Sequence, residues 1–457
     1  MSTTVRPGTE TAWHGEDVTI REVLDALEAI RARFACSEAG DDEHVHPRNC
    51  VMTLISVTPS EADELSAEQT TLLIGREHPA QAIVIREEAP VRGHKLDARI
   101  GTEVQRPQMG CPTECEIITI HVGGQAADHL AELLDPLLVS GVPTYLWWLG
   151  TPPFGKKELL DALRICDGLV VDSARFEEPH RSFHGLSRLL KVAHHRLGLA
   201  DMQWSRLRPW RETIAQFFTP ADRRKFLSGI AEVGVDYAGE GRGNRIAAAL
   251  VTGWMAAALG WKLKRAAAGP GGVVVAHYEA GARSVEVAFR SVQKDHLAPG
   301  ELSAIRIAGA SQGTTFRLTV QHDPERRAAQ AEPAYRTLHP TEGEDDAGFE
   351  LAERRAEWHR DVLHENIESL HHTATGDPPG ESRPKRPVVL SRDRRRPDSQ
   401  RVLLTMIEIG EGAPLRHVQQ LDREDEVALL LDLLSTGTHD EVFNRSLAEA
   451  SALVDRF

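Results

Sequence analysis

The pattern of apolar and polar positions in the first part of the chain alternates between strands and helices. Apolar runs rich in β-branched residues, typical of buried strands, occur at 50–57, 82–86, 117–122, 144–150 and 168–173. Apolar residues at helical spacing occur between or before them, at 19–35, 59–76, 127–138 and 157–165. This alternation predicts a doubly wound, mainly parallel sheet with helices on both faces. The run 144–150 is bulky on both faces, which indicates a central strand, and 96–105 alternates like an antiparallel edge strand.

The pattern changes after residue 176. Four helices are predicted first, at 182–197, 205–218, 221–233 and 244–263. Three alternating strands follow, at 284–289, 302–307 and 315–321, and turn residues separate them. Together they predict an α+β unit in which an antiparallel meander lies beside helices. The fold class is therefore α/β, with an N-terminal doubly wound sheet followed by this second unit.

Composition shifts suggest four segments. The predicted boundaries are 1–175 for the α/β domain, 176–339 for the α+β domain, 340–400 for a charged insertion and 401–457 for a C-terminal strand (402–409) with two helices (424–434 and 440–453). The insertion is poor in apolar residues and carries the basic run 392–396, so it is interpreted as mobile. An electrostatic docking segment is the alternative.

Charge and composition narrow the classes of partner. The 457 residues are 41% hydrophobic, enough to bury at least one large core, and the net charge of −15 disfavours nucleic acid. No apolar run approaches the ~20 residues needed to cross a bilayer. The polar start lacks the pattern of a signal peptide, and the five cysteines are few and odd in number. We therefore expect a cytoplasmic protein with reduced thiols and no membrane partner.

Common phosphate-binding fingerprints are missing from the sequence, but two places could hold an anion. Gly123 and Gly124 precede a predicted helix, whose first backbone N–H groups could bind a phosphate. Asp172 and Ser173 end a predicted parallel strand, where sites of α/β proteins gather, and Lys156 lies in the preceding connection. A tight turn and helix capping explain the same residues. The sharper hypothesis is an enzyme or sensor that binds a sugar phosphate or nucleotide near Gly123, Lys156 and Asp172.

Cys111 and Cys115 form the most suggestive chemical motif. Two thiols with three residues between them could form a redox pair or half of a zinc site, and ordinary turn residues are the alternative. A zinc site needs a second pair of ligands, and His121 adds at most one nitrogen. No nucleophile with its base stands out elsewhere. The sequence therefore predicts no catalytic residues, no metal and no cofactor.

Tryptophans offer candidate contacts to a protein partner. Indole side chains are enriched at interfaces because they combine a large apolar body with one polar group. Burial in the core is the other interpretation. The prediction is that at least one of four indoles faces a partner: Trp147, Trp148, Trp204 and Trp210.

Several runs of the sequence, taken together and in order, resemble a known family. They are CVMTLI at 50–55, REHPAQAIVI at 76–85, DPLLVSGVPTYLWW at 135–148, DGLVVDS at 167–173 and AALVTGWMAAALGW at 248–261. These runs are similar to the glucose-6-phosphate dehydrogenase assembly protein family, OpcA. The resemblance implies a non-catalytic protein of the oxidative pentose phosphate pathway. It would bind glucose-6-phosphate dehydrogenase, promote its active oligomer and raise its activity.

Overall fold

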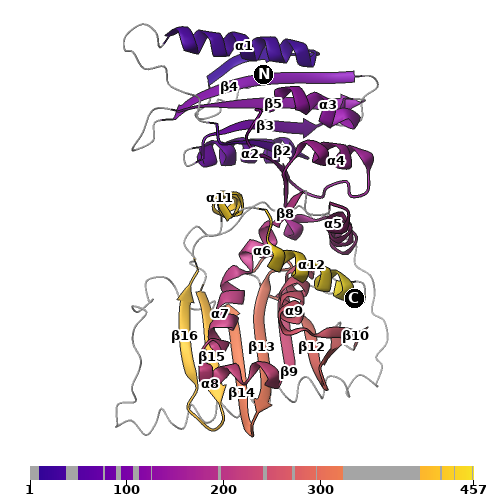
Figure 1. The fold of residues 1–457 in the computed structure, drawn as a ribbon, viewed down its shortest axis with the longest axis vertical. Coiled ribbons are helices and arrows are strands. Elements are labelled where there is room, and N and C mark those ends of the chain that lie inside the picture. The colour runs from indigo at the N-terminus through magenta and orange to yellow at the C-terminus, as the bar shows by residue number, and fades with distance from the viewer. Residues whose placement is uncertain are drawn as a thin grey trace, which may run out of the picture. The chain divides into compact units, whose positions relative to one another are not determined.

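The structure is a computed structural model that contains two compact units. It describes residues 10–37, 50–75, 78–88, 94–105, 113–124, 126–193, 197–239, 244–269, 273–294, 296–322, 402–421, 425–436, 438–454 and 456. The first unit contains residues up to Arg208 together with 249–257 and 424–451. The second contains 209–248, 258–423 and 452–457. Each unit is built on one eight-stranded sheet of described residues (Figure 1).

The sheet of the first unit confirms the predicted α/β fold. Its order is β1-β4-β5-β3-β2-β6-β7-β8. The six neighbouring strands from β5 to β8 are parallel, β4 pairs antiparallel with β5, and β1 pairs antiparallel with β4. The chain adds strands on one side of β2 and then on the other, which makes the sheet doubly wound. The strands are β1 (Glu10–Gly15), β2 (Met52–Thr58), β3 (Ala80–Glu87), β4 (His94–Gln105), β5 (Thr113–Gly124), β6 (Thr144–Trp148), β7 (Gly168–Val171) and β8 (Gly198–Asp201).

Helices of the first unit occupy most of the predicted ranges. The 127–138 segment is broken into short turns because Pro136 cannot continue a helix, leaving α3 (Leu130–Leu134) between two 3-10 turns. The other helices are α1 (Ile20–Ser37), α2 (Glu61–Gly75), α4 (Lys157–Ala162), α5 (Pro179–Ala193), α6 (Met202–Arg206), α11 (Glu426–Thr436) and most of α12 (Glu441–Val454).

Two details of the first sheet differ from the sequence prediction. β4 is not an edge strand, because β1 pairs with its outer side. β8 was not predicted because its four residues, Gly-Leu-Ala-Asp, contain one large apolar side chain, whereas the equally short β7 contains three.

Segments from late in the sequence complete the first unit. Leu429, Leu430, Leu433 and Leu434 of α11 pack with Met52, Trp147 and Met202 in one hydrophobic cluster. His439 forms a parallel bridge with Leu199, beside β8, and the amide of Leu199 donates to the carbonyl of Thr438. Residues 249–257 of α9 (Ile246–Leu259) belong to the same unit and lie against α12 at Gly253.

The sheet of the second unit is mixed. Its order is β10-β11-β12-β9-β13-β14-β15-β16, with β12 and β9 parallel and the other neighbours antiparallel. The strands are β9 (Ile230–Ala238), β10 (Lys262–Ala268), β11 (Val274–Ala280), β12 (Arg283–Val292), β13 (Leu302–Ser311), β14 (Thr314–His322), β15 (Val402–Ile409) and β16 (Leu415–Gln420). The predicted meander is therefore present but is interrupted by β9.

The prediction of a helix at 221–233 is wrong. The range contains only α8 (Ala221–Arg224), which follows α7 (Arg208–Phe218), and a 3-10 turn at Leu227–Gly229, and β9 begins at Ile230. Ile230 and Val233 are three residues apart, as on one face of a helix, but they belong to a strand in the middle of the sheet whose pairing with β13 is irregular at this point.

The two compact units divide the chain differently from the predicted domains. The first sheet extends beyond residue 175 to β8, and 402–420 joins the second sheet as β15 and β16. The predicted insertion at 340–400 lies outside the described residues. Within the described part of the chain, no helix is both long and apolar enough to cross a membrane.

Candidate functional site: the carboxyl edge of the first sheet

The carboxyl ends of the parallel strands carry a cluster of charged side chains. In open α/β sheets, ligand sites form at this edge, where the chain reverses its direction of winding. The reversal here falls between β2 and β6. Asp63 follows β2, Asp172 follows β7 and Asp201 ends β8, so three carboxyl groups share the edge. We name Asp63, Asp172, Ser173, Arg175, Asp201, Arg206 and Glu426 the edge cluster.

Two pairs hold the ends of β7 and β8 together. Arg206 binds Asp172 through both guanidinium nitrogens, at 2.6 and 2.8 Å from the two carboxylate oxygens. Ser173 donates its backbone amide (3.0 Å) and its hydroxyl (2.6 Å) to Asp201, which also accepts from the amide of Gln203 (3.0 Å). Bidentate arginine pairs are among the stronger polar contacts because two parallel bonds fix one geometry.

A second set of contacts brings α11 to the same edge. Arg175 donates to Asp63 at 2.6 Å and contacts Glu426 at 3.5 Å. Ser66 of α2 donates to Glu426 at 3.0 Å. Charges on Asp172 and Arg206 also act on Glu426, so both sets belong to one electrostatic environment. The edge cluster therefore joins the first strands of the unit to a helix that lies more than 200 residues further along the chain.

Burial changes the acidity of two of these carboxyl groups. Burial of Asp201, reinforced by the nearby charge of Asp172, raises the pKa of its carboxyl to about 6, despite the hydrogen bonds from Ser173 and Gln203. Burial likewise raises the pKa of Glu426, against the opposing effects of Ser66 and Arg175. Four carboxyl groups and two guanidinium groups make up the cluster, so its charge favours protons and cations over phosphate.

An Asp201→Asn variant is expected to lose part of the protein's pH dependence of stability. The folded pKa of about 6 lies above the ordinary value of 3.8, so the contribution of this group to stability is present below about pH 4 and is lost as the pH rises through about 6. An amide can still accept from Ser173 and Gln203. Urea unfolding measured between about pH 4 and 7 should show the native protein gaining stability relative to the variant as the pH falls. Parallel profiles would contradict the assignment.

The predicted anion-binding residues do not converge on one site. Gly123 and Gly124 end β5, which lies four strand spacings from β7, about 19 Å at the usual separation of neighbouring strands. Lys156 is exposed in the loop after β6. The polar groups of Ser173 are already donated to Asp201. One small anion therefore cannot contact Gly123 and Asp172 together.

The four tryptophans proposed as partner contacts are interior residues. Trp147 and Trp148 are neighbours on β6, so they point to opposite faces of the sheet, and both faces are covered. Trp204 donates its indole N–H to Asp440 at 2.9 Å. Trp210 packs edge to face on His322. All four are at most 5% exposed, so none of them presents a surface to a partner.

The thiol prediction stays a prediction. Cys111 lies outside the described residues, and Cys115 is described only as a backbone position of β5 opposite Glu103. His121, weighed as a further zinc ligand, instead lies 3.0 Å from Glu64 and 3.2 Å from Arg86. In the part of the chain that the structure describes, no group of three or more histidine, cysteine or acidic side chains is arranged to hold a metal ion.

Sequence reasoning found two members of the edge cluster and missed five. Asp201 repeats the signal that revealed Asp172, an acidic residue directly after a small apolar run, so a search for this feature would have found it. Asp63, Arg175 and Arg206 lie in ordinary polar stretches. Glu426 is so distant in sequence that no local pattern connects it with the sheet.

Comparison with protein families accounts for both halves of the chain. Residues 73–188 match the glucose-6-phosphate dehydrogenase subunit N-terminal domain of OpcA, and residues 197–447 match the corresponding C-terminal domain. The two matches follow one another and together include most of the sequence. The chain belongs to the OpcA family. This confirms the resemblance found in the sequence.

Individual relatives agree with this membership. OpcA proteins with a provisional assignment to the OxPP cycle are 28% identical over 242 residues in Nostoc punctiforme and 26% identical over 214 residues in a Synechocystis species. These alignments include 52% and 47% of this chain, and 48% and 44% of the relatives. The matched region is thus about half the length of each OpcA relative.

A solved dehydrogenase (MviM) from Clostridium difficile aligns with 59% of this chain and 78% of its own. Its identity is 10% and its TM-score 0.31, a similarity too low to carry an inference.

Proposed function

We propose that the protein binds glucose-6-phosphate dehydrogenase, promotes assembly of its active oligomer and raises its activity, without catalysing a reaction itself. The observation that carries the proposal is the match of consecutive parts of the chain to both domains of a glucose-6-phosphate dehydrogenase subunit family. Each match extends over a whole domain and not only over a short motif. A role shared with the family is therefore expected to depend on both domains.

The edge cluster is consistent with this role. The sheet edge that holds ligands in many α/β proteins is here cross-linked by its own side chains, and α11 is bound to it through Glu426 and Ser66. These contacts stabilise the unit. Of the two roles, the geometry thus supports that of a partner-binding protein better than that of a sugar-phosphate enzyme.

Mixing the protein with the dehydrogenase of its host is expected to shift the enzyme to a larger species and to increase its kcat/KM for glucose 6-phosphate. Light scattering coupled to size exclusion measures the first effect, and initial rates at several substrate concentrations measure the second. The protein without the dehydrogenase, supplied with glucose 6-phosphate and NADP, is the control for turnover of its own. Unchanged size and unchanged kinetics over a wide range of concentration would overturn the proposal.

A further inference from the structure

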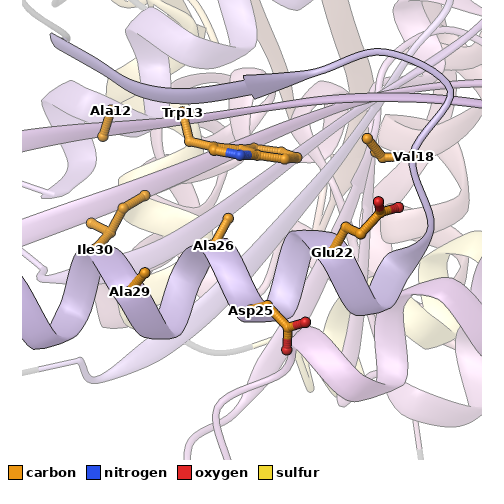
Figure 2. Close-up of a pocket in the computed structure, with 8 residues that line it drawn as sticks. All are labelled: Ala12, Trp13, Val18, Glu22, Asp25, Ala26, Ala29 and Ile30. Atoms are coloured by element: carbon orange, nitrogen blue, oxygen red, sulfur yellow. The ribbon is translucent and has the colours of Figure 1, made fainter.

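A surface pocket lies between the edge strand β1 and helix α1 of the first unit. It has a volume of about 390 Å³ and is lined by Ala12, Trp13, Val18, Glu22, Asp25, Ala26, Ala29 and Ile30 (Figure 2). Its wall on the strand side is the indole of Trp13, and its wall on the helix side is formed by small side chains. We name it the indole pocket.

The indole is held in place by residues close to it in the sequence, on β1 and directly after it. A Cβ atom added to Gly15 would lie 2.7 Å from the Trp13 ring and 2.6 Å from Val18, so the absence of a side chain at Gly15 leaves room for the ring to lie there. The strand pairing is irregular between Thr11 and Trp13, which is where a bulge can redirect a side chain. Trp13 remains partly exposed. The ring is thus positioned by packing and still open to solvent on the pocket side.

The helix side leaves the ring face uncovered. Ala26 and Ala29 of α1 face the strand, and their methyl groups are too short to fill the gap beneath the indole (Figure 2). Residues at these positions with longer side chains would close the pocket. Ile30 forms a buried apolar floor. The pocket is therefore apolar on two sides, with the indole on the strand side and short aliphatic side chains on the helix side.

Acidic side chains supply the charge of the pocket. Glu22 accepts from the backbone amide of Thr19 at 2.8 Å and from its hydroxyl at 2.9 Å, while Thr19 accepts from the amide of Glu22, a capping-box arrangement. The hydrogen bonds from Thr19 lower the pKa of Glu22, so its carboxylate is fixed and charged at neutral pH. Asp25 also borders the pocket, one helical turn further on, but its carboxylate points away from the indole (Figure 2).

We propose that the indole pocket receives an arginine side chain of the partner dehydrogenase. The face of an indole attracts cations through its quadrupole, and a planar guanidinium can stack on it while donating to a carboxylate. Glu22 provides the complementary charge at the rim, and the position of β1 at the edge of the sheet allows a protein surface to approach. This inference rests on the proposed function.

The chemistry of the pocket is tested first without the dehydrogenase. The full chain is labelled with 5-fluorotryptophan, and the fluorine resonance of Trp13 is assigned by its loss in a Trp13→Phe variant. Ethylguanidinium is then compared with ethylurea, a neutral molecule of nearly the same shape. The Trp13 resonance is expected to shift with ethylguanidinium and not with ethylurea, and the shift should weaken in Glu22→Gln, which removes the charge of this residue while glutamine can still cap the helix. An equal response to both molecules, or none to ethylguanidinium, would overturn the assignment.

The role of the pocket in partner binding is tested with matched variants. Trp13→Leu is expected to weaken binding of the dehydrogenase about tenfold, and Glu22→Gln severalfold, as expected for a cation held by an aromatic face and one carboxylate. Glu28→Gln makes the same charge change on an exposed position of α1 outside the pocket, and should leave the affinity unchanged. Thermal unfolding of each variant separates loss of binding from loss of folding.

The outcomes distinguish the two proposals. If the native protein does not bind the dehydrogenase, the proposed function fails, and the fluorine experiment still decides the chemistry of the pocket. If the native protein binds and the folded Trp13→Leu and Glu22→Gln variants bind equally well, the pocket is not the contact. A loss of affinity that is the same for Glu22→Gln and Glu28→Gln would show a general charge effect and would also overturn the proposal.

Discussion

A Gly253→Ala variant is expected to be destabilised by about 2 kcal/mol, although alanine is the better helix former. The added Cβ would lie 2.8 Å from the backbone nitrogen of Ala450 and closer still to the carbonyl oxygen of Ser446. Helix propensity favours alanine by about 1 kcal/mol, whereas overpacking typically costs 1 to 3 kcal/mol. The overpacking wins here because the crowded atoms belong to the backbone of α12, which cannot rotate away as a side chain would.

Urea unfolding of the native and variant proteins measures this difference. Gly234→Ala is the matched control, since a Cβ added there meets nothing closer than Arg306 at 3.8 Å, an ordinary contact distance. The control should change the unfolding midpoint little. A Gly253→Ala protein as stable as the native one would show that α9 and α12 do not approach as closely as described.

Replacing Asp236 with alanine is expected to destabilise the second unit by about 3 kcal/mol. Asp236 is only 4% exposed and lies on β9, between β12 and β13. It accepts two bonds from Arg290, at 3.1 and 3.0 Å, and one from Arg306 at 2.8 Å. Without the carboxylate, two guanidinium groups would repel one another beside an apolar core. Their partial exposure to water keeps the expected loss at the low end for a broken buried ion pair.

Glu286→Ala provides the comparison for this experiment. Glu286 is an exposed carboxylate on β12 that approaches His277 only at 3.8 Å, so its removal should change stability by less than about 0.5 kcal/mol. The double variant Asp236→Ala with Arg290→Met should recover part of the lost stability, because it removes one of the two guanidinium charges that bind Asp236 in the native protein. Equal denaturation midpoints for the Asp236 and Glu286 variants would contradict the argument.

The sequence predicts the first sheet well because its central strands are buried and rich in large apolar residues. β2, β3, β6 and β7 coincide with apolar runs, and helices covering both faces leave little choice of fold for such a pattern. The second sheet is harder to predict, since β9 fits helical spacing over a few residues and β10 has mostly exposed side chains. The position of β9 between β12 and β13 depends on pairing between distant segments, which no local pattern reports.

For the candidate site, even less could be predicted from the sequence. Asp172 and Ser173 could be found because a parallel strand ends there, but their pairing with Asp201 and Arg206 is fixed by the fold and has no local sequence signal. The tryptophans show why residue type alone misleads. Indoles suit both interfaces and cores, and only the coverage of β6 on both faces decides for the core in the case of Trp147 and Trp148.

The participation of α9 and residues 424–451 in the first unit has a consequence for biosynthesis. Domains of a nascent chain generally fold from the N-terminus as they leave the ribosome. When residue 208 of this chain has been translated, α11 has not yet been synthesised, so the apolar surface against which its leucines pack is still exposed. His439, which forms the bridge with Leu199 beside β8, is also still missing. The first unit can be completed only after the second sheet has been synthesised. Chaperone dependence during translation should therefore end late, when the segment carrying α11 and α12 emerges.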